Sequence, residues 1–89
     1  MTEQELFTKN LKLSREFDLY LVEHPEVAER IPANALIVLL PEDDPELCVK
    51  NQELAQARRE PGQAIVSVRV GTLTPPRSRL VNPKVEVAA

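Results

Sequence analysis

Three adjacent carboxylates, Glu42, Asp43 and Asp44, form the densest group of chemically active side chains in the sequence. They follow an apolar run, so we expect them in the loop after a strand, where ligands of open α/β sheets tend to bind. Carboxylate oxygens there could hold a hard divalent cation such as magnesium. The local alternative, which we favour, is that Asp44 caps a helix with Pro45 at its first position, since acidic side chains stabilise a helix start.

Two amide side chains, Asn10 and Asn51, fall on otherwise apolar helical stripes, and Ser14 shares the stripe of Asn10. Buried amides require hydrogen-bond partners, so these groups could converge as a polar pocket that accepts a small ligand. They could instead satisfy one another and nearby backbone groups, which is the interpretation we favour. A small-ligand or metal-binding domain that uses Asn51 and Asn10 together with the acidic loop is therefore our second hypothesis.

The chain has one histidine, His24, and one cysteine, Cys48, which are the candidates for a catalytic group. No serine or second histidine stands at a diagnostic spacing from His24, which precedes Pro25 at an expected helix end. Cys48 falls on the apolar stripe of an expected helix, where burial is the norm, and a single cysteine allows no intramolecular disulfide. Only two glycines are present, which disfavours a phosphate cradle. The sequence thus predicts no catalytic constellation, no cofactor and no confident metal site, and an enzyme is our third hypothesis.

Two helices and two strands must position these groups. Residues 3–23 sort at 100° per residue into a charged stripe with i,i+4 pairs Glu5–Lys9 and Lys12–Glu16, and a broad apolar stripe. The apolar stripe comprises Leu6, Phe7, Leu13, Phe17, Tyr20 and Leu21. A short helical turn is expected over 25–30, a strand covered on both faces and placed centrally over 35–40, a helix over 45–60, and a strand nearer an edge over 64–70.

This order predicts an α/β domain, with α+β as the alternative class: an amphipathic helix followed by a βαβ unit with a short parallel sheet. Two strands make a poor sheet, so we expect a third from the C-terminal segment, with Val85–Val87 as the candidate, or from a second copy. Residues 1–71 should form the compact domain. Residues 72–89 should form a proline-containing basic tail that is extended or adds an edge strand.

The net charge of −3 conceals an asymmetry along the chain. Residues 1–57 carry five basic and twelve acidic side chains, whereas residues 58–89 carry six and two. No aromatic residue follows Tyr20 to stack on bases, so we expect no specific nucleic-acid binding. An acidic body and a basic tail favour pairing with a second copy, or with an acidic partner protein as in an antitoxin. A non-catalytic, homodimeric interaction module is our first hypothesis, and its candidate partner contacts are Arg69, Arg77, Arg79 and Lys84.

No apolar run approaches the roughly 20 residues that cross a bilayer. The acidic start, Met1–Glu5, is unlike a secretory signal, so we expect a cytoplasmic protein that does not contact membranes. The segments Asn10–Phe17, Glu23–Glu26 and Leu40–Leu47 resemble a small uncharacterised family of prokaryotic proteins. That resemblance spans about residues 6–70, implies a prokaryotic origin, and transfers no catalytic role.

Overall fold

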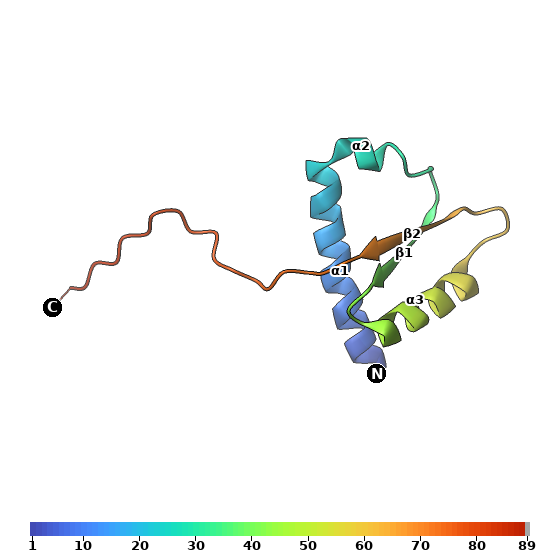
Figure 1. Cartoon of the computed structure of the whole chain (residues 1–89), viewed down its shortest axis with the longest axis horizontal. Coiled ribbons are helices and arrows are strands. Elements are labelled where there is room, and N and C mark those ends of the chain that lie inside the picture. The colour runs from blue at the N-terminus through green and yellow to red at the C-terminus, as the bar shows by residue number, and fades with distance from the viewer. Residues whose placement is uncertain (89) are drawn as a thin grey trace.

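The computed structural model describes residues 1–88 and contains the helices and strands that the sequence predicts before residue 71, each within one or two residues of its expected bounds (Figure 1). The chain is a small α/β domain with a parallel two-stranded sheet. The elements in order are α1 (Glu3–Glu23), α2 (Pro25–Ala28), β1 (Leu36–Pro41), α3 (Pro45–Arg58) and β2 (Ile65–Val70). None of the described helices is long and apolar enough to cross a membrane.

Local side-chain chemistry determines where the two long helices begin. The hydroxyl of Thr2 accepts the backbone N–H of Glu5 at 3.1 Å at the start of α1. The carboxylate of Asp44 accepts the backbone N–H of Leu47 at 3.2 Å at the start of α3. Asp44 is therefore the N-cap that the sequence predicts, and the proline that follows it occupies a first-turn position where its missing N–H has no cost.

The strands β1 and β2 pair in register from Leu36 opposite Ile65 to Pro41 opposite Val70. The N–H of Leu36 donates to the carbonyl of Ala64 at 2.9 Å, so the even-numbered residues of β1 bond to β2. In a parallel ladder the odd-numbered residues then point their backbone groups away from the partner strand. Pro41 is one of these, which explains how a proline ends a buried strand without losing a ladder bond.

The helix α3 packs against both faces of the sheet, and α1 packs against one of them. On one face Leu39 contacts Leu13 of α1 and Leu47 of α3, with Val68 of β2 beside them. On the other face Val38 and Leu40 contact Ala55 of α3. These helices bury β1. The described chain has no strand on the outer side of β1, so the expected central placement of β1 is wrong.

The apolar stripe of α1 is narrower than the helical wheel predicts. Leu13 is buried and Leu6 and Phe17 pack against it. Phe7 and Tyr20, at the margins of the stripe, remain 67% and 46% exposed. A two-stranded sheet is too narrow to cover the whole stripe of a 21-residue helix.

The C-terminal segment leaves the body in an extended form (Figure 1). Leu73 still packs against the core, so the compact body reaches slightly beyond the predicted boundary at residue 71. From there to residue 88 the chain has no helix or strand, and its reach gives the molecule a longest dimension of 66 Å. Val85–Val87, the candidate third strand, is extended and exposed and pairs with neither β1 nor β2 in the described chain, and Ala89 lies outside the described residues.

Candidate functional site

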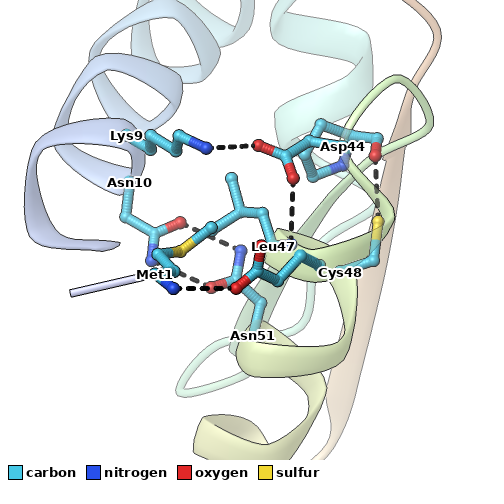
Figure 2. A network of polar contacts seen from close by, with 9 residues as sticks. Met1, Lys9, Asn10, Asp44, Leu47, Cys48 and Asn51 are labelled. Carbon is cyan, nitrogen blue, oxygen red and sulfur yellow. Dashed lines mark hydrogen bonds and ion pairs between the residues drawn. The ribbon is translucent and has the colours of Figure 1, made fainter. Parts of the chain in front are cut away.

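The polar residues that the sequence singles out meet where α1 crosses the start of α3 (Figure 2). The amide nitrogen of Asn10 donates to the amide oxygen of Asn51 at 2.8 Å, and the amide nitrogen of Asn51 donates back at 2.9 Å. The same nitrogen of Asn51 also donates to the carbonyl of Leu39 at 2.8 Å. Because Leu39 is an odd-numbered residue of β1, this bond covers the outer edge of that strand.

This reciprocal pairing uses most of the hydrogen-bonding capacity that a ligand would need. Asn51 is the one polar residue among the buried residues of the described chain, at 7% exposure, and its amide is satisfied by protein groups. Ser14 does not join the pair; it is exposed and lines, with Arg58 of α3, a groove of about 230 Å³ beside the two asparagines. The hydrogen bonds of Asn10 and Asn51 therefore link α1, α3 and β1 to one another.

The three acidic side chains of the loop after β1 differ in their contacts. One carboxylate oxygen of Asp44 accepts the Leu47 N–H, and the other accepts the Nζ of Lys9 at 2.8 Å (Figure 2). Glu42 and Asp43 are exposed. Within residues 1–88 no three His, Cys, Asp or Glu side chains gather closely enough to hold a metal ion. The structure thus assigns Asp44 to capping and ion pairing, and does not join the loop to Asn51 as a ligand set.

The ion pair between Lys9 and Asp44 sets the titration of both groups. The hydrogen bond from Lys9, followed by that from the Leu47 N–H, holds the pKa of the Asp44 carboxyl below its ordinary value. The same hydrogen bond raises the pKa of Lys9. The predicted i,i+4 pair between Glu5 and Lys9 is replaced by this longer-range contact, and in the part of the chain that the structure describes Lys12 and Glu16 do not form an ion pair.

The candidate catalytic groups lie on different elements. His24 ends that helix, donates its backbone N–H to the carbonyl of Tyr20 at 2.9 Å, and stacks its ring on the Tyr20 ring with centroids 4.1 Å apart. Cys48 lies near the start of α3, where its thiol donates to the carbonyl of Pro41 at 2.9 Å (Figure 2).

A second groove lies outside the sites that the sequence analysis proposes. An open groove of about 740 Å³ runs between residues 32–36 and residues 60–64, beside Arg58. It is at the amino ends of both strands, whereas the acidic loop follows the carboxyl end of β1. The only sequence signal for it is the pair of turn segments, Pro32–Asn34 and Pro61–Gly62, that flank the strands.

The candidate partner contacts are all exposed. Arg69 lies on β2, and Arg77, Arg79 and Lys84 lie on the extended tail. None of the four makes an ion pair within the described residues. The tail also exposes its apolar side chains, each by 74% to 88%: Leu80, Val81, Val85 and Val87.

Comparison with known proteins gives one match. The model of a family of unknown function, DUF5647, matches residues 5–83. The match reaches from α1 well into the tail, beyond the span of about residues 6–70 that the sequence resemblance indicates. No curated protein and no solved structure matches the chain.

Proposed function

We propose that this chain, which belongs to the DUF5647 family of unknown function, is a non-catalytic protein-interaction module that associates with a second copy of itself. The observation that carries the proposal is the exposed tail. Four aliphatic side chains there contact almost nothing, and each would stabilise a complex by roughly 1.5–3 kcal/mol if fully buried. Exposed apolar side chains gathered on one segment are typical of a surface that binds another molecule.

Charge supports a second copy as the partner. The body, residues 1–71, carries thirteen acidic and eight basic side chains, an excess of five negative charges, and the tail contributes Arg77, Arg79 and Lys84. A tail of one copy and the body of another are therefore complementary in charge, which speeds encounter and favours this pairing. Exposed charge pairs are screened by salt, so the association should weaken as ionic strength rises.

A cytoplasmic location belongs to the same proposal. The thiol of Cys48 is free, and unpaired cysteines are typical of a reducing compartment. Prokaryotic origin stays a prediction from the sequence resemblance.

The test is size-exclusion chromatography with light scattering on the full chain and on a chain that ends at Thr74, at low and moderate salt. Ending at Thr74 keeps Leu73 in the core, so the body should remain folded. We expect a dimer for the full chain, and a weaker, partly monomeric species for the shortened chain. A full chain that stays monomeric in low salt, even at high protein concentration, would contradict self-association and leave the tail for an outside partner such as the target of an antitoxin.

A further inference from the structure

The outer edge of β2 is an unpaired strand edge. The register places the backbone groups of Val66, Val68 and Val70 toward β1, so those of Ile65, Ser67 and Arg69 point away from it. No hydrogen bond to the latter backbone groups is formed by any described residue. An exposed strand edge of this kind is a template for pairing with another chain.

The outer edge of β1 is protected, in contrast. The amide of Asn51 donates a hydrogen bond to the carbonyl of Leu39, and the thiol of Cys48 donates one to the carbonyl of Pro41. Pro41 itself has no N–H to offer a further strand. The helices α1 and α3 also meet over this edge through the Asn10–Asn51 pair (Figure 2). The outer edge of β2 is therefore better suited than that of β1 to pair with a further strand.

We propose that β2 pairs antiparallel with β2 of a second copy about a two-fold axis through Ser67, which creates a four-stranded sheet. The inference rests on the proposed self-association and names its surface. In this register Ser67 faces the second copy's Ser67 and Ile65 faces the second copy's Arg69, so the two arginines avoid each other. Val66 faces the second copy's Val68 on the side of the sheet where both are half-buried, so the pairing would cover apolar surface.

The direction of the tail favours a second copy as the partner at this strand edge. Antiparallel pairing places the carboxyl end of β2 beside the amino end of the second copy's β2. The tail, which continues from Val70 in the strand direction, would then run along the body of the second copy (Figure 1). Basic Arg77 and Arg79 would thereby reach a body with an excess of negative charge. One interface would use both the free edge and the exposed tail.

Cross-linking tests the register directly. Directly opposed, hydrogen-bonded residues of antiparallel strands have Cα atoms about 5.5 Å apart, within the roughly 4.4–6.8 Å that a disulfide spans. We expect Ser67→Cys, in a Cys48→Ala background, to give a disulfide-linked dimer on mild oxidation. Gln56→Cys in the same background is the control, because Gln56 is exposed on α3 and should remain uncross-linked.

A proline at the same position tests the edge without disturbing the β1–β2 ladder. The N–H of Ser67 points away from β1, so Ser67→Pro removes no bond between these strands but removes two across the two-fold axis. We expect a folded chain by circular dichroism whose dimer dissociation constant rises by about tenfold or more, whereas Ser67→Thr leaves it unchanged.

The outcomes separate the two proposals. A dimer that tolerates Ser67→Pro and gives no Ser67→Cys cross-link overturns the pairing at β2 and leaves self-association standing. A full-length chain that is monomeric overturns both. If Ser67→Pro fails to fold, the cross-link against its Gln56→Cys control decides the register alone.

Discussion

Replacing Asn51 by alanine should be among the most destabilising single changes on the surface between α1 and α3. Asn51 takes part in three hydrogen bonds, with Asn10 in both directions and with the Leu39 carbonyl, and is 7% exposed. Each bond contributes about 1 kcal/mol net to the free energy of unfolding, and the higher helix propensity of alanine offsets roughly half a kcal/mol of the loss. The expected loss in the free energy of unfolding is therefore about 2–3 kcal/mol, a large part of the roughly 4–13 kcal/mol usual for a chain of this length.

Urea unfolding followed by circular dichroism measures this loss. With a slope of about 1 kcal/mol per M for so small a domain, the midpoint should fall by about 2–3 M. Gln52→Ala is the matched control, because Gln52 is the neighbouring amide on α3 and is exposed. Its midpoint should move by less than about 0.5 M.

A double-mutant cycle makes the prediction specific to the amide pair. Asn10→Ala breaks two of the three bonds and should cost about 1–2 kcal/mol. The double variant should lose hardly more than Asn51→Ala alone, because the shared bonds are already broken. The hydrogen-bonded link between α1, α3 and β1 would be refuted if the two single losses in the free energy of unfolding added up in the double variant. It would also be refuted if Asn51→Ala were as stable as Gln52→Ala.

Three further measurements follow from the structure. Leu47→Ala, at a side chain 2% exposed, should lower the free energy of unfolding by about 3 kcal/mol, whereas Val49→Ala, 52% exposed on the same helix, should cost less than about 1 kcal/mol by urea unfolding. Because the folded-state pKa of Asp44 is lowered, its charge stabilises the fold above the ordinary carboxyl pKa and this contribution is lost as pH falls through the lowered value. Asp44→Asn keeps a capping oxygen, so its deficit in Tm relative to the wild type should be present near neutral pH and should vanish in strong acid; a deficit that does not change with pH would contradict the ion pair. Hydrogen exchange in a dilute sample should be slow for the Val66 amide and about tenfold or more faster for the Ser67 amide, and equal rates would contradict the register of β2.

Local sequence signals were sufficient for the elements of the fold. Prolines bound β1 and begin α2 and α3, and the β-branched run of residues 65–70 forms β2. Asp44 followed by a proline is a capping signal that needs no tertiary information. The position of Asn51 on an apolar stripe likewise indicates a buried amide, although the stripe does not identify the Leu39 carbonyl as its partner.

Contacts between distant residues were not accessible in the same way. Lys9 has an acidic neighbour one helical turn away, yet it bonds to Asp44, which is 35 residues distant, because α1 crosses the start of α3. The apolar run of β1 predicts a central strand covered on both faces, and helices do cover both faces, but no described strand lies on its outer side. Likewise, Phe7 is exposed although it shares the apolar stripe, since the breadth of the contact depends on the width of the sheet. Each of these depends on the relative placement of elements, which periodicity does not encode.

The proline at the end of β1 has a consequence for how large an assembly can become. A sheet with two adhesive edges can recruit copies at both sides and grow without limit, which is the route to fibres. Here one side carries Pro41 and the groups already bonded to Asn51 and Cys48, so it offers no continuous row of donors and acceptors. The proposed strand pairing uses the other side alone, and a sheet that pairs through one edge forms a closed complex of finite size.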